Sequence, residues 1–168
     1  MTTTMTDIRY AEETDSLCLH RIHAASWRQA YTGIIPFRSL QAMIGRRDSC
    51  WWSRTIKSGA AILVCSFGGN IVGYATLGRN RTGSLPVDGE LYELYLDPTF
   101  QGVGLGRRLF NAARKNLLSE GPRGFAVWTL ADNDRAMAFY RSLGGRDVAE
   151  GDETFGGKSL SKVAFLWT

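Results

Sequence analysis

Residues 101–106 read Gln-Gly-Val-Gly-Leu-Gly and stand between a strand-like run that ends at Leu96 and a helix-like run at 107–120. Glycine adopts backbone conformations that other residues avoid, so this loop can turn sharply and leave several N–H groups sterically open. At the start of a helix, such groups converge with the positive end of the helix dipole. The loop therefore predicts a binding site for a pyrophosphate group within a strand–loop–helix unit.

The composition is typical of one soluble globular domain. The chain has 168 residues, of which 44% are hydrophobic and 21% charged, so it can bury a sizeable core. No repeat, linker or low-complexity stretch interrupts it, and we interpret residues 1–168 as a single domain. The net charge of +4 comes from scattered basic residues. It fits an anionic ligand such as a nucleotide cofactor, whereas no nucleic-acid-binding motif is present.

Cysteine, histidine and apolar patterns argue against several protein classes. The three cysteines (Cys18, Cys50 and Cys65) are odd in number, and no cysteine or histidine spacing matches a metal site. We therefore expect reduced, buried thiols, no bound metal and a cytoplasmic location. The first residues lack the regions of a signal peptide, and the longest apolar run, at 60–65, is too short to span a bilayer. No association with a membrane is expected.

Hydrophobic periodicity and turn residues predict a mixed α/β domain. The hairpin turn at 68–70 makes the strands on either side of it antiparallel. A crossover helix joins strand 90–96 to strand 125–130, so these two strands must be parallel. The predicted elements are, in order, a strand at 8–10, a helix from Thr14 or Asp15 to Tyr31, a helix starting at Pro36, a short helix capped by Asp48, strands at 60–66, 71–77 and 90–96, a helix at 107–120, a strand at 125–130, a helix starting at Asn133, and two strands within 146–168, the last at 162–167.

Three blocks of this chain resemble the GNAT superfamily of acetyl-CoA-dependent N-acetyltransferases. The first block, at 90–106, is similar to the family's strand, short loop and Gln/Arg-x-x-Gly-x-Gly/Ala signature. The second, at 133–145, is similar to its Asn-x-x-Ala-x-x-Phe-Tyr-x-x-x-Gly block, and the third, at 22–36, to the first helix of many bacterial members. The first two blocks, at their correct separation, are a specific signal. Gly145 departs from the pattern, because an aromatic residue usually stands there.

The resemblance implies a GNAT fold, an α/β (α+β) domain with helices flanking a mixed, mostly antiparallel seven-stranded sheet. Its central parallel strands, 90–96 and 125–130, are expected to splay apart. It also implies acetyl-CoA as co-substrate. In the family, the splay frees backbone groups for the pantetheine arm, and the glycine loop wraps the pyrophosphate. The residues that the resemblance assigns to the coenzyme are Leu94, Tyr95, Leu96, Gln101, Gly102, Val103, Gly104, Leu105, Gly106, Arg107, Asn133 and Tyr140.

The resemblance also implies direct attack of an amine on the thioester, which requires a base and an acid. Glu90 is the candidate base, since several members of the family place a glutamate there. Glu93 is the alternative, and strand alternation predicts that it points to the opposite face. Tyr140 is the candidate acid for the departing thiolate, and Asn133 is expected to bond the pantetheine arm or cap its own helix. An N–H near Leu96 is expected to polarise the acetyl carbonyl.

The acceptor side is assigned through the first two helices, which form one wall of the acceptor cleft in the family. Trp27, Tyr31 and the segment 34–37 are therefore expected to border it, and Glu93 is added as a further acceptor residue. Trp27 fits a core position equally well. His23 is expected to be a hydrogen-bonded helix histidine rather than a base.

The leading hypothesis is an N-acetyltransferase of a small-molecule primary amine. The alternatives are an acetyltransferase of protein N-termini or lysines, a non-catalytic acyl-CoA-binding sensor and a nucleotide-binding regulator. Residues 20–45 contain no acidic cluster, which argues slightly against polyamines. A homodimer is a further expectation, because residues 154–158 lead into an aromatic-rich last strand where many relatives pair.

Overall fold

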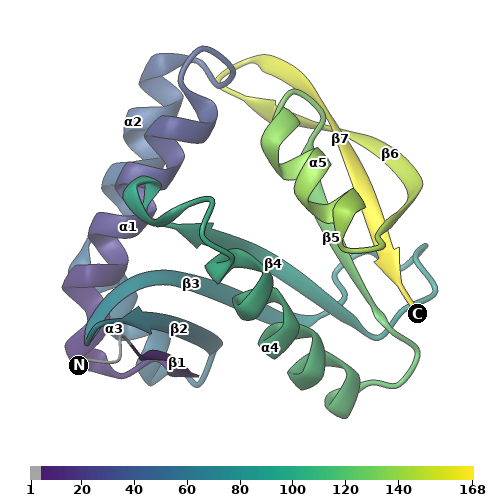
Figure 1. The fold of residues 1–168 in the computed structure, drawn as a ribbon. Helices are drawn as coiled ribbons and strands as arrows, with labels where there is room; N and C mark the ends of the chain where they lie inside the picture. Colours follow the sequence, from purple (N-terminus) through teal and green to yellow (C-terminus); the bar gives the residue numbers. More distant parts are fainter. Residues whose placement is uncertain (1–4) are drawn as a thin grey trace.

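Seven strands form a single sheet in the order β1-β2-β3-β4-β5-β7-β6, with helices on both faces (Figure 1). The computed structural model describes residues 5–168. The strands are β1 (Thr6–Tyr10), β2 (Ala61–Phe67), β3 (Asn70–Arg79), β4 (Gly89–Leu96), β5 (Phe125–Leu130), β6 (Arg146–Phe155) and β7 (Lys158–Trp167). The helices are α1 (Ser16–Tyr31), α2 (Phe37–Arg46), α3 (Ser49–Lys57), α4 (Leu105–Glu120) and α5 (Asp134–Ser142), with 3-10 turns η1 (Glu13–Asp15) and η2 (Pro98–Phe100). This order matches the predicted one, with boundaries shifted by a few residues.

The two central parallel strands separate soon after they meet. β4 and β5 pair only at Gly89 with Phe125 and at Glu90 with Ala126. The other strand pairs are antiparallel. The expected mixed sheet with a splayed parallel pair is confirmed, and the gap beyond Glu90 divides the sheet into a β1–β4 part and a β5–β7 part (Figure 1).

A β-bulge in β4 changes which side chains share a face. Thr76 of β3 pairs with Glu93, whereas the residue after Thr76 pairs with Leu91, so Tyr92 has no partner in the β3–β4 ladder. One extra residue interrupts strict alternation along a strand. Glu90 and Glu93 therefore lie on the same face of the sheet, and the prediction that Glu93 points to the opposite face is wrong.

Apolar stripes on the helices bury both faces of the sheet. Leu109, Ala113 and Leu117 of α4 join a buried cluster that also contains residues of α5 and β7, as the helical spacing predicts. On the other face, Leu19 of α1 and Trp52 of α3 pack against β2 and β3. α4 and α5 thus cover one face, and α1 to α3 cover the other (Figure 1).

The starts of two helices follow the predicted caps. Asp48 Oδ1 accepts a hydrogen bond from the Trp51 N–H at 2.8 Å, and Asn133 Oδ1 accepts one from the Ala136 N–H at 3.2 Å. These bonds satisfy N–H groups that have no partner inside the helix. Within residues 5–168, no helix combines the length and the apolar character that crossing a membrane requires.

Trp167 of β7 occupies the space beside Gly145, where the family pattern has an aromatic residue. A Cβ on Gly145 would lie 2.6 Å from Cζ2 of the indole and 2.9 Å from the carbonyl oxygen of Tyr140. The indole stacks on Phe125 with ring centroids 5.1 Å apart, and its Nε1 donates to the carbonyl oxygen of Leu143 at 3.0 Å. The indole of Trp167 therefore fills the space that a side chain at position 145 would take.

The three cysteines differ in exposure. Cys65 is buried in β2, and burial raises the pKa of its thiol. Cys18 is half-buried and Cys50 is exposed. All three are free thiols, as expected, but the prediction of burial is correct only for Cys65.

Candidate active site

The glycine loop turns sharply between η2 and α4. Gly102 and Gly104 have φ angles of 80° and 85°, in the left-handed region that favours glycine. A Cβ on either residue would stand in open space, with no other heavy atom within 4 Å. α4 then begins at Leu105, with Arg107 and no acidic residue in its first turn. This helix start presents N–H groups and positive charge beside an open loop.

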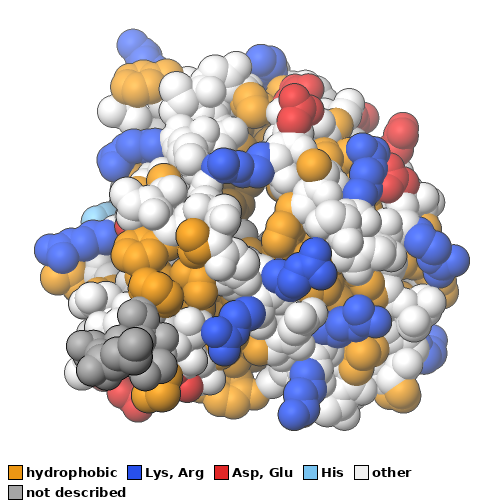
Figure 2. Space-filling model, viewed as in Figure 1, with side chains coloured by type: hydrophobic (Ala, Val, Ile, Leu, Met, Phe, Trp, Pro, Cys, Tyr) orange, Lys and Arg blue, Asp and Glu red, His pale blue; other side chains and the backbone are white. Residues whose placement is uncertain are grey.

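A cavity of about 650 Å³ lies beside the loop, and we call it the glycine-loop cavity. Figure 2 shows the face of the molecule with α4 and α5 hollowed near its middle, with several basic side chains around the hollow. Val103 is 65% exposed and Leu105 is buried, and neither lines the cavity. The residues assigned to the coenzyme that do line it are Leu94, Tyr95, Leu96, Gln101, Gly102, Gly104, Gly106, Arg107, Asn133 and Tyr140.

Side chains of α1 and α5 hold the loop in place. Gln101 Nε2 donates to Gln29 Oε1 at 2.9 Å and to the carbonyl oxygen of Leu96 at 3.3 Å, while Arg135 donates to Gln101 Oε1. Ser26 Oγ donates to the same Leu96 oxygen at 3.0 Å. These contacts were not predicted, because Ser26 and Gln29 follow the ordinary period of an amphipathic helix. They use both lone pairs of the Leu96 carbonyl.

The backbone of β4 turns other groups towards the gap. The Asp97 N–H donates to the carbonyl oxygen of Val72 at 2.7 Å. Residues of an antiparallel strand alternate between facing the partner strand and facing away, so Leu96 and Leu94 direct their backbone groups away from β3. β5 pairs with neither residue. The N–H of Leu96 and the backbone groups of Leu94 therefore lie on the open edge.

A second cavity, of about 510 Å³, lies against the sheet face that carries Glu90 and Glu93, and we call it the aromatic cavity. Tyr95 lines both cavities, so they meet at this residue. The hydroxyls of Tyr95 and Tyr31 are 2.6 Å apart, and burial raises the pKa of both. The rings that line the aromatic cavity are Trp27, Tyr31, Tyr92, Tyr95, Trp128 and Phe155, and its charged side chains are Arg47, Arg81, Glu90, Glu93, Glu153 and Lys162.

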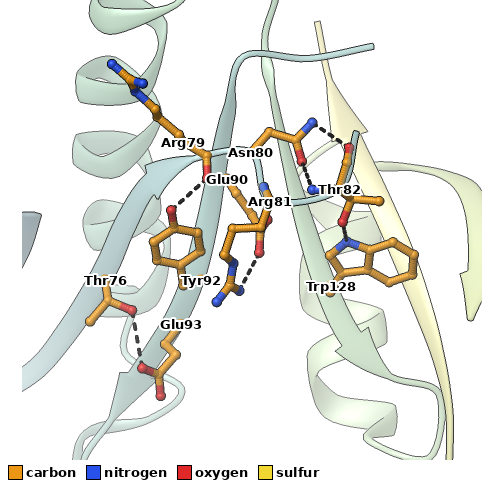
Figure 3. A network of polar contacts seen from close by, with 9 residues as sticks. All are labelled: Thr76, Arg79, Asn80, Arg81, Thr82, Glu90, Tyr92, Glu93 and Trp128. Carbon is orange, nitrogen blue, oxygen red and sulfur yellow. Dashed lines mark hydrogen bonds and ion pairs between the residues drawn. The ribbon is translucent and has the colours of Figure 1, made fainter. Parts of the chain in front are cut away.

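Glu90 is held rigidly at the base of the splay. It is 1% exposed, and both carboxylate oxygens accept from Arg81, one from the backbone N–H at 3.0 Å and one from Nη2 at 2.6 Å (Figure 3). The guanidinium also lies over the ring of Tyr92, 4.0 Å from its centroid. Charge-assisted bonds of this kind hold a buried carboxylate in a fixed direction.

Glu93 carries a separate ion pair. Its Oε1 lies 2.6 Å from Nη1 of Arg47 and accepts from Thr76 Oγ1 at 3.3 Å, while Tyr74 donates to Oε2 at 3.4 Å. The Arg47 guanidinium lies over the ring of Trp51, 4.7 Å from the centroid. Glu90, paired with Arg81, and Glu93, paired with Arg47, thus face the same cavity. Glu93 lies closer to Tyr95 along β4 than Glu90 does.

Tyr140 lies in the glycine-loop cavity at 6% exposure. Burial is the main reason that the pKa of its hydroxyl is raised above the ordinary value, and the negative charge of Glu93 adds to the effect. Within residues 5–168, its hydroxyl makes no hydrogen bond to another side chain or to the backbone. A protonated hydroxyl without an internal partner is therefore available to a group in this cavity.

The first two helices contribute to the aromatic cavity much as expected. Trp27, Tyr31 and Ile35 line it, whereas Phe37 is 69% exposed and does not. His23 lies behind this wall at 0% exposure, with no hydrogen-bond partner for either ring nitrogen within the described chain. The prediction of a hydrogen-bonded histidine is therefore wrong. Burial, followed by the charges of nearby basic groups, lowers the pKa of His23 to about 3.

Several charged residues of the aromatic cavity carried no signal in the sequence. Arg81 lies in a polar loop, while Glu153 and Lys162 belong to the C-terminal hairpin. The turn of that hairpin reaches α1 and α2 (Figure 1), where Lys158 Nζ donates to the carbonyl oxygen of Ile34 at 3.5 Å. Residues around this turn therefore wall the cavity, and no local pattern indicates where a hairpin will fold.

Comparison with known proteins agrees with this architecture. Residues 20–144 match the family described as Acetyltransferase (GNAT) family. The uncharacterized N-acetyltransferase YuaI of Bacillus subtilis is 30% identical over 164 residues, which cover 97% of this chain and 93% of that protein. The N-alpha-acetyltransferase RimI of Mycobacterium tuberculosis is 41% identical over 80 residues, 46% of each chain.

A solved structure extends the comparison to the fold. The PaiA N-acetyltransferase of Thermoplasma acidophilum, crystallised with coenzyme A, has a TM-score of 0.71 and 17% identity, with 94% of this chain and 98% of that chain covered. The family match includes β4, the glycine loop and residues 133–144 of the second block. The chain therefore belongs to the acetyltransferase (GNAT) family, and it is an N-acetyltransferase.

Proposed function

We propose that acetyl-CoA binds in the glycine-loop cavity and that its acetyl group passes to the primary amine of a small molecule in the aromatic cavity. The observation that carries this proposal is the position of Tyr95, which lines both cavities beside the gap where β4 and β5 stop pairing. Direct transfer requires the thioester and the amine to meet at one point. Two cavities that share one residue satisfy this requirement.

The residues of the glycine-loop cavity fit a coenzyme that carries a diphosphate and amide groups. Gly102 and Gly104 leave the loop open, and Arg107 adds charge at the start of α4. The backbone groups of Leu94 and the Leu96 N–H on the open edge fit an amide chain that pairs like a strand. The bound coenzyme supplies an activated thioester. The Leu96 N–H is our candidate donor to the acetyl carbonyl.

Glu90 is our candidate base, and Tyr140 is our candidate acid. Glu90 is buried and lines the aromatic cavity as a carboxylate with fixed direction, which suits it to accept a proton from the amine, directly or through water. Glu93 is the alternative, because it lines the same cavity on the same face of β4. The Tyr140 hydroxyl stays protonated and has a proton to donate to the departing thiolate.

The test is a screen of primary amines for release of free thiol from acetyl-CoA, followed by kinetics of Glu90→Gln and Tyr140→Phe. We expect each variant to lower kcat/KM at least tenfold, or about 1.4 kcal/mol of activation free energy. Glu120→Gln, an exposed change at the end of α4, should leave the rate unchanged. If both the Glu90 and the Tyr140 variant keep full activity, neither residue has the role that we assign to it.

Acetylation of a protein N-terminus is a second candidate, supported by the local similarity to the N-alpha-acetyltransferase RimI. The β6–β7 turn against α1 and α2 argues for a walled cavity rather than an open peptide groove. Tetrapeptides in the same screen decide between the two. A sensor would instead bind acetyl-CoA and release no thiol with any amine. The homodimer and the cytoplasmic location stay predictions.

A further inference from the structure

The aromatic cavity holds charges of both signs beyond those that acetyl transfer requires. Besides the two ion pairs on β4, it contains Glu153 of β6 and Lys162 of β7. Within residues 5–168, neither of these side chains has an oppositely charged group within 4 Å. A cavity with unmatched charges of both signs favours a ligand that also carries both signs.

Arg81 has hydrogen-bonding capacity left after it binds Glu90. Its side chain is 65% exposed, whereas the Glu90 side chain at the other end of the ion pair is buried. A guanidinium has five N–H donors, and only one of its nitrogens, Nη2, donates to the Glu90 carboxylate. The ring of Tyr92 supports one face of the guanidinium. The remaining donors therefore extend from a fixed position into the cavity (Figure 3).

Lys162 of β7 lines the aromatic cavity beside Trp128 of β5. Its Nζ is 4.8 Å from the ring centroid of Trp128, and Trp128 Nε1 donates to Thr82 Oγ1 at 3.1 Å. Thr82 follows Arg81 in the chain, and Figure 3 shows Thr82 and Trp128 across the gap from Glu93, with the Arg81 side chain beside Tyr92. Arg81 therefore lies beside the carboxylates of β4, and Lys162 lies on the side of the cavity formed by Trp128.

We propose that the acceptor is an amino acid, a molecule with a carboxylate close to its amine. Arg81 and Lys162 bind the carboxylate, and the amine faces the carboxylates of β4. Arg81 already holds Glu90, so a carboxylate bound to its free donors brings an amine two bonds away next to the candidate base. The aromatic rings offer contact to an apolar side chain. This inference rests on the proposed function.

Other amine classes match the cavity less well. A polyamine would place a second ammonium near Arg81 and Lys162, where like charges repel. A simple monoamine would leave Lys162 without a counter-charge and the remaining donors of Arg81 without a charged partner. A peptide N-terminus has an amide in place of the carboxylate and would lose the charge-assisted bonds. These three classes are therefore the alternatives in the test.

The first experiment compares matched acceptors that differ only in the group beside the amine. For several apolar amino acids, the rate of thiol release is measured with the acid, its amide, the decarboxylated amine and a diamine of similar length. At neutral pH, a larger fraction of the amine is unprotonated in the amide than in the free amino acid. This difference favours the amide and therefore works against the proposal. For at least one amino acid, we expect kcat/KM to be at least tenfold higher than for its amide, its decarboxylated amine and the diamine. Equal or faster turnover of its amide, amine or diamine counterpart overturns the proposal.

The second experiment changes Lys162, which we place in neither the base nor the acid role. Lys162→Gln should raise KM for the amino acid at least tenfold, with kcat and the kinetics of the decarboxylated amine little changed. Lys162→Glu should shift the preference towards the diamine. Lys115→Gln, on the exposed side of α4, is the matched control. Unchanged KM in both Lys162 variants contradicts the carboxylate site.

The two proposals fail in different ways. Thiol release with simple amines but not with amino acids removes only the amino-acid assignment. No thiol release with any amine or peptide removes the acetyl transfer itself.

Discussion

His23 is fully buried on α1, and its low pKa makes folding stability depend on pH. The folded protein binds a proton at His23 only near pH 3, whereas an unfolded chain binds it near the ordinary value of 6.5. The unfolded state therefore holds more protons between these values, and stability falls as the pH falls through this window. We expect a loss of about 1.4 kcal/mol per pH unit below about 6.

Urea unfolding between pH 5 and 7 measures this slope. His23→Phe replaces the ring with one that does not titrate, so the slope in this window should disappear in the variant. NMR titration of the wild-type protein offers a direct check, because the ring signals of His23 should stay constant from pH 7 to pH 5. A midpoint near 6.5 for this ring would show that the native structure accommodates the proton.

At the scale of elements, the contact between the α5–β6 turn and the end of β7 depends on Gly145. A methyl group there would contact the indole of Trp167, which is held by its stack on Phe125 and its bond to Leu143. Gly145→Ala should therefore lower the free energy of unfolding by about 1–3 kcal/mol, the usual effect of overpacking. Urea denaturation measures the change.

Gly45→Ala is the matched control for this substitution. Gly45 lies within α2, and no atom outside its local backbone lies within 4 Å of where a Cβ would stand, so alanine should be neutral or stabilise the helix. In a Trp167→Leu background, the loss caused by Gly145→Ala should shrink, because the clashing ring is gone. An undiminished loss in that background would mean that the Tyr140 carbonyl, rather than the indole, opposes the methyl group.

At the scale of the whole molecule, two parts of the sheet are joined between β4 and β5 by only two residue pairs. A coenzyme that contacts β4, the glycine loop and α5 would connect these parts. At one hundred times its Kd it should add about 2.7 kcal/mol to the free energy of unfolding. For a chain of this size, Tm should then rise by about 5–10 °C. Thermal unfolding with and without coenzyme A measures the shift.

Two glycine variants separate loss of binding from loss of stability. Gly104 and Gly33 have φ angles of 85° and 86°, and both have open space at the Cβ position. Alanine should strain each turn by a similar amount. Only Gly104→Ala should also reduce the stabilisation by coenzyme A, because Gly104 lines the glycine-loop cavity and Gly33 does not. Equal stabilisation of both variants would count against the loop as the diphosphate site.

The local pattern of the chain determined the order of elements, the turn at Gly102 and Gly104, and the caps at Asp48 and Asn133. These features depend on residues a few positions apart, whose backbone preferences and periodicity can be read directly. The parallel pairing of β4 and β5 also followed, since a crossover helix joins them. Most residues that the family resemblance assigns to the coenzyme line the glycine-loop cavity.

Tertiary structure alone decided how the residues of the aromatic cavity are arranged. The bulge at Tyr92 places Glu93 on the face of Glu90, and Lys162 reaches this cavity from a distant hairpin. Strand register and hairpin placement depend on contacts between residues far apart in the chain, and strict alternation fails where one strand has an extra residue. The sequence therefore identified an N-acetyltransferase and its glycine loop, whereas the charges of the aromatic cavity come together only in the folded chain.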